Sequence, residues 1–237
     1  RYRFLDTTRA YARAKLEEAG DSDAARQRHA AHFRAIFEQA EAEWETKPTP
    51  VWLDTYGAHV DTLRAALDWA FSPDGDPSIG IAITVAAVPF WFALLKVEEC
   101  HARVQRALEL LERPAHRNER QRMKLYAALG WQQMRAIANQ PQGAAAWQRT
   151  LDIALHIGDT DYQARALWAL WVDRTNDGQP QAALRMAERF ALLAEQQQDL
   201  AGQLRAVSGH MAVNLCAGHY REALAQSVQF DILDPRT

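Results

Sequence analysis

The stretch Asn139-Gln140-Pro141-Gln142-Gly143-Ala144 recurs twice further along the chain. It returns as Gly178-Gln179-Pro180-Gln181-Ala182-Ala183 and again as Gly218-His219-Tyr220-Arg221-Glu222-Ala223. A fixed period of about 40 residues, with two helices per unit, is typical of an α-solenoid, whose repeats bury their apolar faces against their neighbours. Such proteins usually bind partners, so the repeat favours a binding role over catalysis.

Helical periodicity flanks these turns and predicts four helix pairs: 77–95 with 97–112, 117–138 with 142–157, 160–176 with 180–198, and 199–216 with 219–232. Aligning the turns brings small residues into two columns, namely Ala127, Ala166 and Ala206, and Gly130, Ala169 and Gly209. Small side chains let neighbouring helices approach closely, which a stacked repeat requires. The columns therefore have a packing cause.

The segment 1–72 predicts three further helices. The first ends at Gly20, the second begins near Ser22, and the third has Thr49 as its N-cap and Pro50 at its first position. The stretch Ser72-Pro73-Asp74-Gly75-Asp76-Pro77 is the strongest break, with two prolines around Asp-Gly. We therefore place a domain boundary there: 1–72 is an N-terminal helical segment, and 73–237 is the repeat array.

Composition narrows the function classes. The formal charge of −3 disfavours a nucleic-acid surface over the whole chain, and two cysteines among 237 residues suit a reducing cytosol. The chain opens without a signal peptide or an initiator Met, which suggests a piece of a longer protein. The uncharged run 79–95 is short for a membrane span and contains Pro89, so we expect a buried helix and no membrane partner.

The turn around Gly218, Tyr220, Ala223 and Leu224 resembles the intra-repeat turn of a tetratricopeptide (TPR) repeat. The two earlier copies have Pro141 and Pro180 in place of the tyrosine, and the period is longer than that of a standard TPR unit. The resemblance implies an all-α, TPR-like superhelix of helical hairpins, right-handed, with divergent repeats.

Three motifs in the segment 1–110 carry a second resemblance: Arg1-Tyr2-Arg3-Phe4-Leu5-Asp6-Thr7-Thr8-Arg9-Ala10-Tyr11-Ala12, Arg28-His29-Ala30-Ala31-His32-Phe33, and Asp61-Thr62-Leu63-Arg64-Ala65-Ala66-Leu67-Asp68-Trp69-Ala70. They resemble stretches of large bacterial STAND-type regulators, where the first closes the winged-helix part of an ATPase module. Phe90-Trp91-Phe92 with Glu98-Glu99 is a looser match to the same proteins.

This resemblance implies that the chain is the C-terminal arm of a transcriptional regulator that senses a ligand or a partner protein. Its partners would be a protein or small-molecule effector and its own ATPase module, and it would meet DNA only through domains outside this sequence. The chain has no P-loop motif, so ATP and Mg²⁺ would belong to an upstream module and the fragment itself would need no cofactor. Self-association is left open.

We find no convincing acid–base pair or nucleophile motif, and we predict no catalytic residue. The pairs His29 with His32 and Cys216 with His219 lack further ligands at suitable spacing, so we predict no metal site. Packing and turn hydrogen bonds explain them more simply.

Aromatic and polar residues on the expected first helices of the repeats are the best candidates for a binding groove, since these helices line the concave surface of TPR-like arrays. They are Trp91, Trp131, Trp168, Trp171, Arg135, Arg174 and Asn214, the last three forming one aligned column. Filling of the inter-helix core is the competing explanation for each Trp. The Arg side chains would meet carboxylates.

The sequence thus predicts a cytoplasmic sensor or protein-interaction arm of an ATPase-linked regulator. Ligand binding in the groove would shift the packing of the arm on the ATPase module, which requires different affinities for the two arrangements. The alternative is a free-standing TPR-like adaptor that binds a peptide or a protein subunit.

Overall fold

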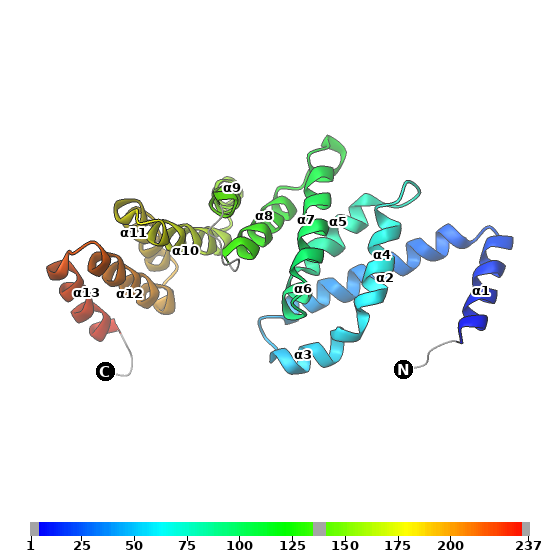
Figure 1. The fold of residues 1–237 in the computed structure, drawn as a ribbon, viewed down its shortest axis with the longest axis horizontal. Helices are drawn as coiled ribbons and strands as arrows, with labels where there is room; N and C mark the ends of the chain where they lie inside the picture. The colour runs from blue at the N-terminus through cyan, green and yellow to red at the C-terminus, as the bar shows by residue number, and fades with distance from the viewer. Residues whose placement is uncertain (1–4, 135–140, 234–237) are drawn as a thin grey trace. The chain divides into compact units, whose positions relative to one another are not determined.

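The computed structural model describes residues 5–134 and 141–233, which fold into helices joined by short turns (Figure 1). No β-strand occurs in these two ranges. The all-α fold predicted from the repeat is confirmed. The chain divides into two compact units, an N-terminal unit Arg1–Gln121 and a C-terminal unit Arg122–Thr237, and each is described by itself.

The N-terminal unit contains seven α-helices and two short 3₁₀ helices among its described residues: α1 Asp6–Glu18, α2 Ser22–Glu43, α3 Thr49–Tyr56, η1 Gly57–His59, α4 Val60–Ala70, α5 Pro77–Ala86, α6 Val88–Ala93, α7 Val97–Leu111 and η2 Pro114–His116. The long helix α2, blue in Figure 1, packs on α4 and α5, and α5 packs in turn on α4 and α7. Helices on both sides of the expected boundary at 72 therefore share one unit, whose limit lies at Gln121.

An aromatic cluster forms the core of this unit. The ring of Phe90 lies 5.1 Å from that of Phe37 and 6.0 Å from that of Trp52, centroid to centroid. Trp52 is fully buried, and its indole Nε1 donates a 2.8 Å hydrogen bond to the carbonyl oxygen of Ala40. Because the polar atom of the ring is satisfied, this large side chain is buried without an unpaired donor.

The uncharged run at 79–95 is divided between two helices rather than forming one. All residues of α5 from Ile79 to Ala86 are buried, as expected for a helix that is apolar on every side. The helix ends at Ala86 because Pro89 has no N–H to donate to the carbonyl of Val85, and α6 begins at Val88. In the described parts of the chain, no helix is both long enough and apolar enough to cross a bilayer.

The third predicted helix is also interrupted. The 3₁₀ turn η1 separates α3 from α4, and Figure 1 shows that the two helices run in different directions. Glycine has low helix propensity, and Gly57 occupies the first position of this turn. The predicted cap at Thr49 is wrong: α3 already includes Thr49, and no side chain caps its first turn.

The C-terminal unit consists of three hairpins formed by six helices within its described residues: α8 Glu119–Met134, α9 Pro141–Ile157, α10 Thr160–Asn176, α11 Pro180–Gln196, α12 Leu200–Cys216 and α13 Tyr220–Leu233. These bounds agree closely with the predicted helix pairs. We call α8, α10 and α12 the first helices and α9, α11 and α13 the second helices of their hairpins. Helix α10 packs on α9 and α11, and α12 packs on α11 and α13, so these helices contact their neighbours in sequence.

Equivalent turns in successive hairpins share their hydrogen bonds. The amide of Gln179 donates to the carbonyl of Arg174 at 2.9 Å, and that of His219 donates to the carbonyl of Asn214 at 2.8 Å. The glycines before these amides, Gly178 and Gly218, have φ of 68° and 78°, which glycine adopts without strain. The recurring sequence therefore encodes one recurring backbone geometry.

The glycines of the small-residue columns have the packing role predicted for them. A Cβ atom placed on Gly209 would overlap the ring of Trp171, and one placed on Gly130 would overlap that of Trp147. Indole rings therefore lie directly on the backbone of these helices, which only glycine permits.

Candidate partner-binding site

Two of the predicted tryptophans come together in the C-terminal unit. Trp131 on α8 and Trp168 on α10 have ring centroids 5.7 Å apart with an interplanar angle of 37°. Trp147 on α9 is fully buried, and its ring centroid lies 5.3 Å from that of Trp131 in an edge-on arrangement. Both Trp131 and Trp168 pack against the hydrophobic core of the unit and are partly exposed. Their exposed parts form an aromatic surface between consecutive first helices, which we call the Trp131–Trp168 surface.

Arg174 lies elsewhere on α10. It lines a pocket of about 350 Å³ together with residues of the second helices and of the turn between α10 and α11; the lining residues are Gln148, Leu170, Arg174, Gln179, Ala182, Arg185 and Met186. We call this the Arg174 pocket. At about 100° per residue, Leu170 and Arg174 are about 160° and 120° around α10 from Trp168. The pocket and the Trp131–Trp168 surface therefore occupy different faces of that helix.

Two other predicted residues lie inside the hairpins. Trp171 is 8% exposed and packs in a cluster with Ala183, Ala187 and Val213. Asn214 is 5% exposed, and its Nδ2 donates a 3.0 Å hydrogen bond to the Gln226 side chain on α13. Their surroundings are those of packing residues.

The last two predicted residues are not part of either surface. Trp91 is fully buried in the N-terminal unit, on α6. Arg135 falls outside the described residues. The structure thus brings together Trp131 and Trp168, leaves Arg174 on a separate pocket, and buries Trp91, Trp171 and Asn214.

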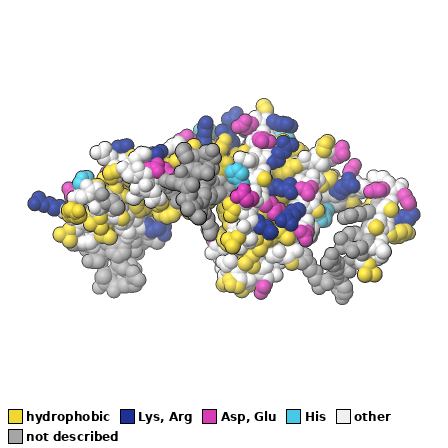
Figure 2. Space-filling model, viewed as in Figure 1, with side chains coloured by type: hydrophobic (Ala, Val, Ile, Leu, Met, Phe, Trp, Pro, Cys, Tyr) yellow, Lys and Arg dark blue, Asp and Glu magenta, His cyan; other side chains and the backbone are white. Residues whose placement is uncertain are grey.

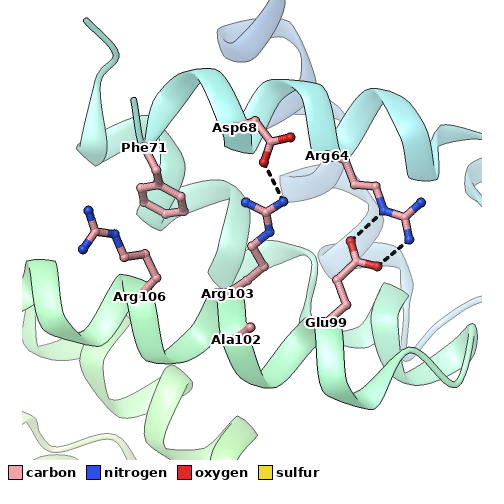
Figure 3. Close-up of a pocket in the computed structure, with 7 residues that line it drawn as sticks. All are labelled: Arg64, Asp68, Phe71, Glu99, Ala102, Arg103 and Arg106. Atoms are coloured by element: carbon pink, nitrogen blue, oxygen red, sulfur yellow. Dashed lines mark hydrogen bonds and ion pairs between the residues drawn. The ribbon is translucent and has the colours of Figure 1, made fainter. Parts of the chain in front are cut away.

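The N-terminal unit has a groove of about 610 Å³ between α4 and α7, which we call the α4–α7 groove (Figure 3); it is lined by Arg64, Asp68, Phe71, Glu99, Ala102, Arg103 and Arg106. Arg64 makes two hydrogen bonds to Glu99, Nε to Oε1 at 2.9 Å and Nη2 to Oε2 at 2.7 Å. One helical turn further on in each helix, Arg103 Nη2 donates to Asp68 Oδ1 at 2.6 Å.

These pairs fix the alignment of α4 on α7. Both pairs have the same separation in sequence, so the two helices run side by side in the same direction. The Arg64 guanidinium holds the pKa of Glu99 below its ordinary value, and burial opposes this effect. Figure 2 shows acidic and basic side chains intermingled over this unit. Arg64 and Arg103 are thus occupied by neighbouring carboxylates.

Among the described residues of the C-terminal unit, two titratable side chains have atoms buried without a hydrogen-bond partner. They are Asp173, through Oδ2, and His210, through Nε2. Burial raises the pKa of Asp173, the charge of Asp177 adds to this, and Arg174 opposes it. Burial lowers the pKa of His210, against the charge of Glu188. The charge of Arg174 therefore acts on Asp173, although Asp173 Oδ2 forms no hydrogen bond to Arg174.

The histidine pair considered from the sequence packs around a phenylalanine. The ring centroids of His29 and His32 lie 4.9 and 5.5 Å from that of Phe33, and His59 approaches the same ring at 5.5 Å. Among the side chains that the structure describes, no group of three or more His, Cys, Asp or Glu is arranged to hold a metal ion.

Sequence reasoning missed Gln148, Gln179 and Arg185 of the Arg174 pocket, because only the folded hairpins bring residues of α9, α10 and α11 to one place. It also missed the Arg64–Glu99 pair, although both residues fall within stretches that carry the regulator resemblance. The sequence does contain a signal for the pairing of α4 with α7. A basic residue precedes an acidic one by four positions at Arg64 and Asp68, and an acidic residue precedes a basic one by four positions at Glu99 and Arg103.

Comparison with known proteins adds evidence on the fold. No protein-family model matches the chain, and no curated protein matches it. The chain is similar to the crystal structure of BtubC (BKLC) from P. vanneervenii, with a TM-score of 0.66 and 15% sequence identity over 89% of each chain. At this identity, the likeness shows a shared helical fold.

Proposed function

We propose that the chain is the effector-sensing or protein-interaction arm of a multidomain, ATPase-linked transcriptional regulator that works in the cytoplasm. The observation that carries the binding role is the Trp131–Trp168 surface, where two partly exposed indoles lie against each other, tilted by 37°, between consecutive first helices. Large rigid aromatic side chains offer contact area at low entropic cost and dominate many protein interfaces. The link to an ATPase rests on the sequence resemblance of the segment 1–110.

The proposed role is binding rather than catalysis. An effector or partner segment covers Trp131 and Trp168 and favours one packing of the arm on the upstream module. A bound ligand shifts this equilibrium only by its difference in affinity for the two arrangements. ATP and Mg²⁺ belong to that upstream module, and DNA contact belongs to further domains.

The proposal is tested by effector-dependent transcription from a target promoter in cells that carry the full-length protein. Trp168→Leu should lower activation at least fivefold, because it removes one of the two indoles of the surface. Trp44→Leu is the matched control, since Trp44 is also partly exposed and contacts another tryptophan, Trp52, edge to face with ring centroids 5.0 Å apart. Full activation of Trp168→Leu at equal protein level would contradict the proposed surface.

The second candidate function is a free-standing adaptor that binds a peptide or a protein subunit. The same surface supports it, because helical hairpin arrays bind partners without an attached ATPase. Under the adaptor hypothesis, the isolated chain has its complete activity. Under the regulator hypothesis, partner binding changes the nucleotide state of an upstream module.

A further inference from the structure

Two arginines, Arg174 and Arg185, line the Arg174 pocket. Neither Arg174 nor Arg185 forms a hydrogen bond or ion pair through its side chain with another residue within the described parts of the chain. Arg174 is partly exposed and Arg185 is exposed, so both side chains are accessible to solvent. A planar guanidinium matches a carboxylate through two parallel hydrogen bonds, which an unpaired arginine is free to make.

Comparison with the next hairpin shows that this arrangement is not imposed by the fold. Asn214 occupies the position of Arg174, since both carbonyls accept the same turn hydrogen bond. Asn214 closes onto its own hairpin by bonding to Gln226, and it is buried. Arg174 instead lines the pocket. A side chain at this position can therefore form a hydrogen bond within its own hairpin, as Asn214 does. Arg174, in the hairpin of α10 and α11, forms no such bond.

The remaining lining residues define the kind of anion that fits. The side-chain amide of Gln179 supplies a neutral hydrogen-bond donor, while Leu170, Ala182 and Met186 supply an apolar wall. The side-chain amide of Gln148, which also lines the pocket, donates a 2.8 Å hydrogen bond to Asp152. Free phosphate has no hydrocarbon to place on such a wall. The volume of about 350 Å³ is at the lower end of small-molecule pockets, which span about 300–1,000 Å³.

We propose that the Arg174 pocket binds a small organic acid with two carboxylates on a short aliphatic chain. One carboxylate pairs with Arg174 and the other with Arg185, and the aliphatic chain lies on Leu170 and Met186. The charge of Asp177 acts on Asp173 at this end of α10 and that of Arg174 opposes it, so a ligand with two negative charges needs both guanidinium groups. The site is separate from the Trp131–Trp168 surface and does not depend on the function proposed for that surface.

The test is isothermal titration calorimetry of the whole chain with succinate at low ionic strength. Butyrate, which has the same number of carbons and one carboxylate, and inorganic phosphate are titrated alongside. We expect succinate to bind at least tenfold more tightly than either. If butyrate binds as tightly as succinate, the proposal that the ligand has two carboxylates is overturned. If phosphate binds more tightly than succinate, the proposal that the ligand has an aliphatic chain is overturned.

Variants locate the site. Arg174→Gln and Arg185→Gln should each weaken succinate binding at least tenfold. Arg189→Gln should leave it unchanged, because Arg189 is exposed on the same helix as Arg185 but does not line the pocket.

Two results would overturn the site. One is the absence of succinate binding to the wild-type chain; the other is an equal loss of affinity in Arg189→Gln, which would indicate general charge attraction. Circular dichroism melts check that each variant is folded. If Arg174→Gln does not fold, the exposed Arg185 still gives the decisive comparison.

Discussion

The two units of this chain both pack aromatic rings on glycine, at Gly80 in the N-terminal unit and at Gly130 and Gly209 in the C-terminal unit, but they differ in the partners of the arginines that line their pockets. In the N-terminal unit, α4 and α7 are aligned by ion pairs across a groove, and Arg64 and Arg103 each have a carboxylate partner. In the C-terminal unit, indole rings lie directly on the backbone at Gly130 and Gly209. Close packing fixes the helices there, and Arg174 and Arg185 are left available in a pocket.

This contrast shows how to interpret an arginine in a helical array. Arg64 and Arg174 both line a concave site on a helix. Among the described residues, Arg64 bonds a carboxylate through two of its guanidinium nitrogens and Arg174 bonds none. A paired arginine fixes helix alignment, and its loss leaves a partly buried acid without those hydrogen bonds. An unpaired arginine contributes little to folding and is available to a ligand.

The greatest loss of stability should come from breaking the ring-on-glycine packing of the C-terminal unit. Gly209→Leu should destabilise this unit by about 3 kcal/mol, because its side chain and the Trp171 ring cannot occupy the same space. Ala212→Leu is the control, since Ala212 is exposed on the same helix. Urea unfolding followed by circular dichroism measures both, and amide hydrogen exchange in α12 assigns the loss. A Gly209→Leu variant as stable as wild type would contradict the packing account.

An intermediate effect should follow from breaking the paired arginine. Arg64→Met should destabilise the N-terminal unit less than Gly209→Leu destabilises the C-terminal one, because Glu99 loses two charge-assisted hydrogen bonds but not its access to solvent. The effect is modest because the side chain of Arg64 is 38% exposed, and solvent screens its charge. The midpoint of urea unfolding should therefore fall by a measurable but smaller amount.

Arg174→Gln is the matched comparison for Arg64→Met and should change stability by less than about 0.5 kcal/mol. Urea unfolding of the two variants in one buffer measures both changes. Equal destabilisation by the two substitutions would mean that Arg174 also has a structural partner, and it would remove the distinction between paired and unpaired arginines.

The weakest effect is a dependence of stability on pH. The pKa of Glu99 is lowered from 4.5, so its contribution is fully present above that value and is lost as the pH falls through the depressed value. The wild-type chain should therefore lose more stability than Glu99→Gln between about pH 5 and the acid limit of folding. Thermal melts at closely spaced pH values check this, and parallel curves for the two proteins would contradict it.

The sequence predicted the C-terminal unit well because its signals are local. The helix predicted at 160–176 is α10 to the residue, and the glycines at the turns adopt the positive φ that ends a helix. The small-residue columns likewise predicted close helix approach. Each of these features depends on residues within the same repeat or the next one. A periodic sequence pattern is enough to predict such short-range contacts.

The N-terminal unit was predicted less well because its features depend on contacts between distant segments. The division of 79–95 follows from one proline, yet the burial of α5 requires α2, α4 and α7 around it. The break at 72 lies inside this unit for the same reason: a loop rich in proline and glycine interrupts the chain without separating the helices that flank it.

The candidate site shows the same limit. The aromatic residues could be assigned to first helices from sequence, but contact between Trp131 and Trp168 and burial of Trp171 on Gly209 depend on the rotation of each helix. Arg174 was selected because it aligns with Asn214, and only the structure shows that these two side chains have opposite environments. The sequence did not mark Arg185 as a candidate site residue, because exposed arginines are common on the second helices of such hairpins.

The sharpest test of the sensor-arm account is to read the coding region immediately upstream of Arg1. The account predicts a P-loop ATPase module there, preceded or accompanied by a DNA-binding winged helix, in the same reading frame as this chain. An initiator codon with no such module would contradict the regulator function and would favour the free-standing adaptor.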